Sequence, residues 1–244
     1  ILAMGEEVWR VHTVGFPAID MISEGNYATQ DEVVKKLHLD LNRPIVLFTQ
    51  HSVTTEFDLA ENQIDPSISA LKELAKNSVQ IIATYPNNDA GGLSIIKKLE
   101  VLDSYAMDNI QVHQSLGRYL YHGLLALAKN TENRVVCVGN SSSGIKETPV
   151  FGCPTVNIGS RQKGRLRGKN VIDVEYNAEL IINAVNKCTA DKKFRQICSE
   201  TDNPYYLGDA GKKIAKILAK TTIDSALIRK KMTLKGECKN GWFS

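Results

Sequence analysis

Short apolar runs alternate with amphipathic segments along most of the chain. Most of these runs contain no internal polar residue, which is typical of strands buried on both faces of a sheet. Helical segments of about ten residues separate them, and this spacing favours parallel pairing of consecutive strands. We therefore predict an α/β fold, a Rossmann-like parallel sheet with helices on both faces. The predicted strands are 9–14, 44–49, 80–84, 110–113, 135–138, 154–158 and 171–174.

The amphipathic segments predict helices with recognisable starts. Thr29 is a suitable N-cap for a helix over 30–39, because its hydroxyl can accept from a free N–H of the first turn. We expect one Rossmann-like domain over residues 1–225 and a basic tail over 226–244. Further predicted helices cover 59–76, 92–102, 116–129 and 209–220.

Length and composition agree with a globular chain of this kind. With 244 residues, 43% of them hydrophobic, the chain can bury a sizeable core. The net charge of +3 is small and the basic residues are dispersed, so nucleic acid is not an expected partner. No apolar run approaches the roughly 20 residues of a membrane span, so no membrane partner is expected. The 5 cysteines form no C-x-x-C pair, which predicts reduced, buried thiols in a cytoplasmic protein.

Polar and charged residues follow most of the predicted strands. His51, His113 and Arg161 each lie at or just after the end of a strand, as do the segments 87–89 and 141–147. The carboxyl ends of parallel strands meet at one edge of a sheet, and open α/β sheets bind ligands at this edge. The sequence therefore predicts a ligand site there.

The segment Gly139–Glu147, GNSSSGIKE, is the most informative of these strand ends. A buried strand, a Gly- and Ser-rich turn and a helix start form the arrangement that binds phosphate through free N–H groups, hydroxyls and the helix dipole. Ser141 and Ser142 are the candidate phosphate ligands. Glu147 lies six residues beyond Ser141 and can reach a pair of ribose hydroxyls. The alternative is an ordinary helix cap.

Two of the other strand ends allow both a structural and a functional interpretation. His51 can pack on the next helix, or it can bond phosphate and move a proton near neutral pH. The following residues 54–56 are compatible with a helix cap. Residues 89–92 form either a helix start or a polar loop against a ligand. His12, His38 and His122 lie within or beside helix and strand patterns, and no chemistry is assigned to them.

The basic loop 159–165 contains Arg161 and two further cations. It is either a solvated loop or a lid that closes over a pyrophosphate, since the guanidinium fork suits phosphate oxygens. No His, Cys, Asp or Glu cluster has the spacing of a metal site, so neither a metal nor a cofactor is expected. A G-x-G-x-x-G fingerprint and a Walker A loop are also absent from the sequence. The remaining candidate is a nucleotide or sugar-nucleotide site built from Ser, Glu, His and Arg.

Together these motifs resemble the C-terminal half of the UDP-N-acetylglucosamine 2-epimerase family, and within it the hydrolysing branch of sialic-acid biosynthesis. The non-hydrolysing branch usually has His-Arg-Arg-Glu-Asn where this chain has QHSVTTE, and Asp-Ser-Gly-Gly where it has Asn-Ser-Ser-Ser-Gly. Ser52 departs from the proline of many hydrolysing members, which we expect to alter loop stiffness rather than chemistry. The motifs that carry the resemblance are Gly15–Asp20, Gln50–Glu56, Pro86–Gly91, Gly139–Glu147, and Phe151–Gly159 with Arg161 and Gln162.

The resemblance implies the C-terminal lobe of a two-domain fold of the glycosyltransferase-B type, with a UDP-sugar bound between the lobes. It implies a reaction that converts UDP-N-acetylglucosamine and water to N-acetylmannosamine and UDP, through a 2-acetamidoglucal intermediate. His51 would act catalytically on the phosphate side of the departing UDP, Ser141 and Ser142 would hold the diphosphate, and Glu147 would bind the ribose. The full set implied for UDP binding is Gly15, Asn88, His113, Ser141, Ser142, Glu147 and Arg161.

In this family the acidic residues that act at sugar C2 come mainly from the N-terminal domain. We therefore expect this chain to be the nucleotide-binding half of an enzyme, inactive alone, completed by a missing N-terminal domain and assembled as a homo-oligomer. The motifs suit UDP-N,N′-diacetylbacillosamine equally well, and a non-hydrolysing epimerase is a further alternative. Alternatives from other classes are a glycosyltransferase of similar architecture and a non-catalytic UDP-binding module.

Overall fold

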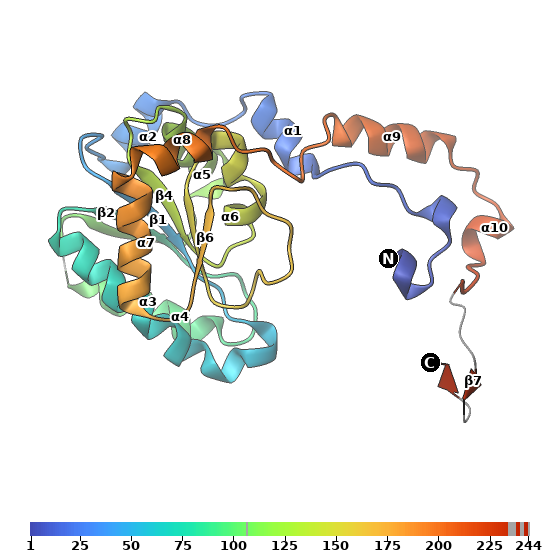
Figure 1. Ribbon diagram of the computed structural model, residues 1–244, viewed down its shortest axis with the longest axis horizontal. Coiled ribbons are helices and arrows are strands. Elements are labelled where there is room, and N and C mark those ends of the chain that lie inside the picture. The colour runs from blue at the N-terminus through green and yellow to red at the C-terminus, as the bar shows by residue number, and fades with distance from the viewer. Residues whose placement is uncertain (106, 234–237, 240–241, 244) are drawn as a thin grey trace. The chain divides into compact units, whose positions relative to one another are not determined.

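The computed structural model describes residues 1–105, 107–233, 238–239 and 242–243. The chain divides into two compact units (Figure 1). The sheet unit comprises residues 21–205, and the terminal unit comprises residues 1–20 together with 206–244. The predicted domain over 1–225 thus covers the whole sheet unit and part of the terminal unit.

The sheet unit contains a six-stranded parallel sheet with the strand order β3-β2-β1-β4-β5-β6. This is the Rossmann order, in which the chain winds outward from β1 in one direction and then from β4 in the other. The predicted α/β fold is therefore confirmed. The strands are β1 (Ile45–Thr49), β2 (Gln80–Thr84), β3 (Ile110–His113), β4 (Val135–Gly139), β5 (Thr155–Ile158) and β6 (Val171–Val174).

Both faces of the sheet are covered, because successive side chains of a strand point to opposite faces. Val46 and Phe48 of β1 pack in one core cluster, with residues of α3 (Ala60–Lys76), α4 (Gly92–Ser104) and α7 (Ala178–Ala190). Ile45 and Leu47 pack in the other core cluster, with residues of α2 (Gln30–Leu37) and α5 (Gly117–Ala126). Figure 1 shows α3, α4 and α7 on one side of the strands. The second layer contains α2 (Gln30–Leu37), α5 (Gly117–Ala126) and η4 (Leu127–Lys129).

The predicted helix over 30–39 is present and begins as expected at Thr29. The Thr29 hydroxyl accepts from the Glu32 N–H, and the Glu32 carboxylate accepts from the Thr29 N–H, which is a capping box. The helix ends two residues earlier than predicted, because His38 adopts the left-handed conformation with φ 50°. The predicted helix start near Leu59 is preceded by a 3₁₀ helix, η3 (Thr54–Leu59).

One predicted strand is wrong. Residues 9–14 form no strand; Val8–Arg10 is the 3₁₀ helix η2, and Val11 beyond it is extended. An extended segment becomes a strand only when a neighbour satisfies its backbone, and β1 to β6 all lie within the sheet unit.

The remaining elements of the sheet unit are α6 (Ser143–Lys146), η5 (Thr148–Phe151) and α8 (Lys192–Ser199).

Polar contacts join the two chain segments of the terminal unit. The carboxylate of Asp20, in α1 (Pro17–Ser23), accepts from the N–H groups of Ala210 and Gly211, which start α9 (Ala210–Lys220). This capping from a remote residue satisfies donors that a helix leaves free. Its other elements near the N-terminus are η1 (Leu2–Met4) and η2 (Val8–Arg10). Within or next to the predicted tail 226–244 lie α10 (Ser225–Ile228) and the paired strands β7 (Cys238–Lys239) and β8 (Trp242–Phe243).

Two composition-based expectations can be compared with the structure. Cys137, Cys153, Cys188 and Cys198 are buried free thiols, as predicted, whereas the side chain of Cys238 lies outside the described residues. Burial raises the pKa of Cys137 to about 12. In the described part of the chain, no helix has both the length and the apolar character that crossing a membrane requires.

Candidate functional site

The strand order places the switch point of the sheet between β1 and β4. From β1 the chain continues to β2 on one side, whereas β4 pairs with β1 on the other side. Ligands of open α/β sheets bind where the winding direction reverses, outside the carboxyl ends of the strands. His51 follows β1 and the serine turn, residues 139–147, follows β4. The topology thus brings the two strongest sequence candidates to the same edge of the sheet.

Gly139 allows the serine turn to start directly beside β1. Its φ is 128°, and a Cβ at this position would lie 2.0 Å from the carbonyl oxygen of Thr49. The next residue, Asn140, donates its backbone N–H to that same oxygen at 3.1 Å. Only glycine therefore fits at the end of β4.

Asn140 connects the loops that follow β1, β4 and β5. Its side chain is fully buried; its Oδ1 accepts from the His51 N–H at 2.7 Å, and its Nδ2 donates to the His51 carbonyl at 2.8 Å. Its own carbonyl accepts from Arg161 at 3.1 Å and from Gln162 at 2.7 Å. Sequence reasoning treated Asn140 only as part of the serine turn and missed this role.

The imidazole of His51 is held in one orientation by the loop after β2. Its Nδ1 accepts from the backbone N–H of Asn87 at 3.0 Å. Burial, and then the positive charge of Arg161, lower the pKa of His51 to about 4. The ring is therefore neutral at pH 7, and the hydrogen bond at Nδ1 assigns its proton to Nε2. In this tautomer His51 offers the ligand edge a hydrogen-bond donor.

Arg161 lies against the loop after β2 as well as against Asn140. Its Nη2 is 3.8 Å from the carboxylate of Asp89, which also accepts from the Asn87 side chain at 2.6 Å. Burial lowers the pKa of Arg161, and Asp89 counteracts this shift. The adjacent Gln162 is fully buried and anchors the base of the loop. The base of this basic loop is therefore not freely solvated.

A helix starts in the serine turn, as predicted, but it is short. The helix α6, Ser143–Lys146, has 4 residues, too few for a substantial macrodipole. Among the described residues, the N–H groups of Ser141 and Ser142 have no hydrogen-bond acceptor, while the Ser141 hydroxyl accepts from the Ser143 N–H at 3.3 Å. The capacity of this turn to bind an anion therefore depends on free N–H groups and the charge of Arg161 rather than on a helix dipole.

Glu147 is an ionised carboxylate held by two donors. Its Oε2 accepts from the Ser143 hydroxyl at 2.8 Å and lies 3.0 Å from Nε2 of His122. Burial alone would raise the pKa of Glu147, but the hydrogen bonds from His122 and Ser143 outweigh it and lower the pKa. Sequence reasoning assigned no chemistry to His122 and did not anticipate this contact.

A cavity of about 310 Å³ lies beside Glu147, and we call it the Glu147 pocket. Thr84 and Tyr85 at the end of β2 form one part of its wall, and the loop 114–118 forms another. Tyr121, His122 and Glu147 complete it. Its volume is at the lower end of the range for small-ligand pockets.

The contacts described above do not include three of the predicted site residues, His113, Asn88 and Gly15. His113 is 3.3 Å from the side chain of Gln111, burial lowers its pKa, and it is not one of the residues that line the Glu147 pocket. Asn88 is exposed in the loop after β2. Gly15 belongs to the terminal unit and has φ 95°. Their roles in binding stay predictions.

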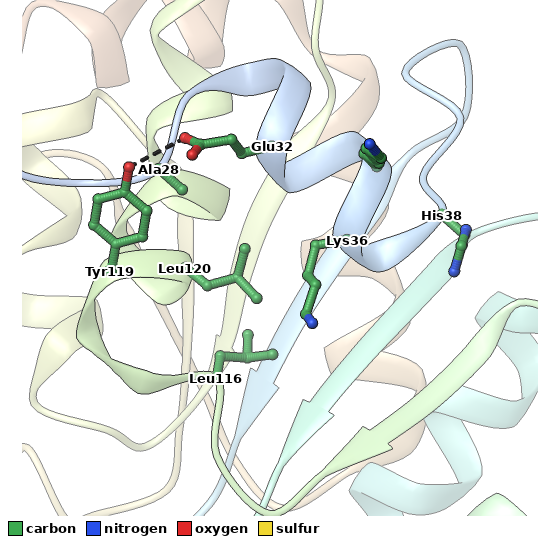
Figure 2. Close-up of a pocket in the computed structure, with 8 residues that line it drawn as sticks. Ala28, Glu32, Lys36, His38, Leu116, Tyr119 and Leu120 are labelled. Carbon is green, nitrogen blue, oxygen red and sulfur yellow. Dashed lines mark hydrogen bonds between the residues drawn. The ribbon is translucent and has the colours of Figure 1, made fainter.

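A second, larger cavity of about 660 Å³ lies between α2 and α5 (Figure 2). Leu116 and Leu120 form an apolar wall near Lys36, and Glu32 and Tyr119 are hydrogen-bonded at 3.1 Å. None of the predicted site residues lines this cavity. The site predicted from the sequence is therefore at the sheet edge and not in the larger cavity.

The fold defines an α/β protein with an open parallel sheet, and polar and charged residues follow the carboxyl ends of its strands. Solved structures confirm the fold class. *Staphylococcus aureus* MnaA, solved with UDP, is 18% identical with a TM-score of 0.65, and the match covers 89% of this chain and 55% of that chain. *Methanocaldococcus jannaschii* UDP-GlcNAc 2-epimerase, solved with UDP-GlcNAc and UDP, is 18% identical with a TM-score of 0.62 over 90% of this chain and 57% of that chain.

The chain belongs to the UDP-N-acetylglucosamine 2-epimerase family, whose model matches residues 1–219. It is 36% identical to a *Campylobacter jejuni* GDP/UDP-N,N′-diacetylbacillosamine 2-epimerase (hydrolyzing), over 72% of this chain and 44% of the relative. It is 32% identical to a *Neisseria meningitidis* UDP-N-acetylglucosamine 2-epimerase, over 86% of this chain and 51% of the relative. The chain thus spans about half the length of the curated relatives it matches.

Proposed function

We propose that this chain is the UDP-binding half of a hydrolysing UDP-sugar 2-epimerase. The substrate in this proposal is UDP-N-acetylglucosamine, and UDP-N,N′-diacetylbacillosamine is the alternative sugar nucleotide. The segments QHSVTTE and GNSSSGIKE favour the hydrolysing type. Relatives named as hydrolysing enzymes from *Campylobacter jejuni* and *Legionella pneumophila*, 36% and 31% identical, support the same type.

The arrangement around Glu147 is the observation that carries this proposal. An ionised carboxylate lies in the wall of a pocket beside the end of β2 and the loop that follows β3, and its Oε2 is occupied by two donors. Among the described residues, nothing donates to its Oε1. A carboxylate oxygen of this kind is an acceptor for ribose hydroxyls. Ser141 and Ser142 precede Glu147 in the same turn, and their free N–H groups suit the diphosphate. Arg161 supplies a positive charge.

The state of His51 indicates which part of the reaction this chain performs. Loss of UDP from the sugar develops negative charge on the diphosphate, and a fixed donor that faces this charge lowers the barrier. Neutral His51 has its Nδ1 bonded to Asn87 and carries its proton on Nε2, so it suits this task. The other nitrogen, Nδ1, is a poor base because its lone pair already accepts from the Asn87 N–H. The base that removes the C2 proton of the sugar therefore comes from outside this chain in our proposal.

Incubation with UDP-N-acetylglucosamine, followed through the anomeric protons by NMR, tests the proposal. We expect no turnover by the chain alone, because in our proposal the base that acts at C2 comes from outside it. Formation of N-acetylmannosamine and UDP would establish the hydrolysing reaction but contradict the assignment of a half-enzyme. Formation of UDP-N-acetylmannosamine would contradict the hydrolysing type.

A further inference from the structure

His122 is an unusual residue for its position in α5. Its side chain is buried, with 3% of the residue exposed, and its ring packs 5.9 Å from the ring of Phe151 and 6.2 Å from that of Tyr121. Its Nε2 is 3.0 Å from Glu147 Oε2, whereas its Nδ1 is buried and has no hydrogen-bond partner among the described residues. Packing alone does not account for a histidine here, since an apolar side chain would fill the space without a desolvated, unpaired nitrogen.

The contact with Glu147 offsets this cost and fixes the carboxylate. Because an ionised carboxylate only accepts hydrogen bonds, the proton in this contact is on Nε2 of His122. The Ser143 hydroxyl donates to the same oxygen, Oε2, at 2.8 Å. Two donors that converge on one oxygen restrict rotation of the carboxylate and leave Oε1 as the acceptor for another group.

We propose that His122 is a positioning residue for nucleotide binding: it orients Glu147 so that Oε1 accepts from the ribose hydroxyls. This inference rests on the proposed function, because it assumes that a ribose occupies the Glu147 pocket. It goes further in assigning the recognition of the ribose diol to a pair of residues that lie 25 positions apart in the chain.

A comparison of UDP with 2′,3′-dideoxy-UDP tests this role, since the second ligand has no ribose hydroxyls. Affinities are measured by NMR titration of the ¹⁵N-labelled full chain, which also reports weak binding. We expect the unmodified chain to bind UDP at least about tenfold more tightly than the dideoxy analogue, which corresponds to about 1.4 kcal/mol. In His122→Phe, which keeps an aromatic ring but loses the N–H donor, we expect this preference to fall below about threefold, a loss that one charge-assisted hydrogen bond can explain.

Matched variants separate positioning from packing. His122→Gln retains an N–H donor and should keep most of the preference for UDP. Phe151→Leu disturbs the ring packing around His122 without removing its donor, so it should lower the melting temperature and keep the preference. Glu147→Gln should lose the preference, as His122→Phe does.

The outcomes also separate this inference from the proposed function. If the unmodified chain shows no preference for UDP, or Glu147→Gln retains it, the assumption of a ribose at Glu147 is wrong. If Glu147→Gln loses the preference but His122→Phe retains it, the inference about His122 alone is wrong. If His122→Phe does not fold, His122→Gln and Phe151→Leu are compared instead. An equal loss of the preference for UDP in these two variants would mean that His122 acts only through packing.

Discussion

His51 shows how two contacts can define the chemistry of one side chain. Asn87 donates to its Nδ1, and Asn140 holds its backbone on both sides. A histidine left in solvent near its unperturbed pKa would be a mixture of charged and neutral forms at neutral pH. In this site burial and Arg161 favour the neutral form, and the N–H of Asn87 selects one tautomer.

The lowered pKa of His51 predicts a pH dependence of stability. Its pKa falls from 6.5 in the unfolded chain to about 4 in the folded chain. Between these values the unfolded state binds more protons, so the contribution of His51 to stability is fully present above pH 6.5 and is lost as the pH falls towards 4. We expect the free energy of unfolding, from urea titrations, to decrease over this range, and less steeply in His51→Gln. Equal slopes in the two proteins would contradict the assignment of a neutral, buried His51.

Sequence reasoning missed the contacts of Asn140 and His122 for the same physical reason. Ser141, Glu147, His51 and Arg161 could be selected because each follows a strand, and strand ends share an edge. Asn140 and His122 act on partners that lie 89 and 25 positions away. A buried polar side chain whose partner is distant in the chain leaves no periodic signal, so only the folded structure identifies such pairs.

At the scale of elements, the end of β4 controls the approach of the serine turn to β1. Gly139→Ala should lower the free energy of unfolding by more than about 3 kcal/mol, because its Cβ would collide with backbone rather than with a flexible side chain. Gly25→Ala is the matched control: Gly25 also has a positive φ, 76°, but no atom lies within 4 Å of an added Cβ. Gly25→Ala should lower the free energy of unfolding only by the cost of the left-handed backbone conformation, about 1 to 2 kcal/mol. Similar losses in the two variants, measured by urea denaturation, would contradict the close packing of β4 against β1.

The accuracy of the predicted strands followed their pairing in the sheet. The strands at 80–84 and 110–113 have the predicted bounds, because each pairs with a neighbour in the sheet. The segment 9–14 begins with the same alternation of apolar and polar residues as 110–113 but does not belong to the sheet. Local pattern therefore predicts which segments favour an extended backbone, whereas strand formation also requires a pairing partner that the pattern does not specify.

At the scale of the whole molecule, the order of the strands determines where ligand chemistry can gather. The alternation of strands and helices predicted the parallel sheet, and the sheet rule predicted the edge at which polar residues meet. The strand order itself, with β1 beside β4, was not predicted; it comes from the structure and identifies the switch point. The site therefore depends on long-range topology as much as on its motifs.

Binding of UDP to the chain is the measurement that tests the central claim most directly. In a titration followed by ¹H–¹⁵N NMR, we predict saturable shifts for residues of the serine turn and the Glu147 pocket, and binding at least about tenfold weaker in Glu147→Gln, in line with the loss of a charge-assisted hydrogen bond. Asp209→Asn, in the terminal unit, is a control that should bind like the unmodified chain. Absence of saturable binding at millimolar UDP, or equal binding by Glu147→Gln, would contradict the assignment of a UDP site at this edge of the sheet.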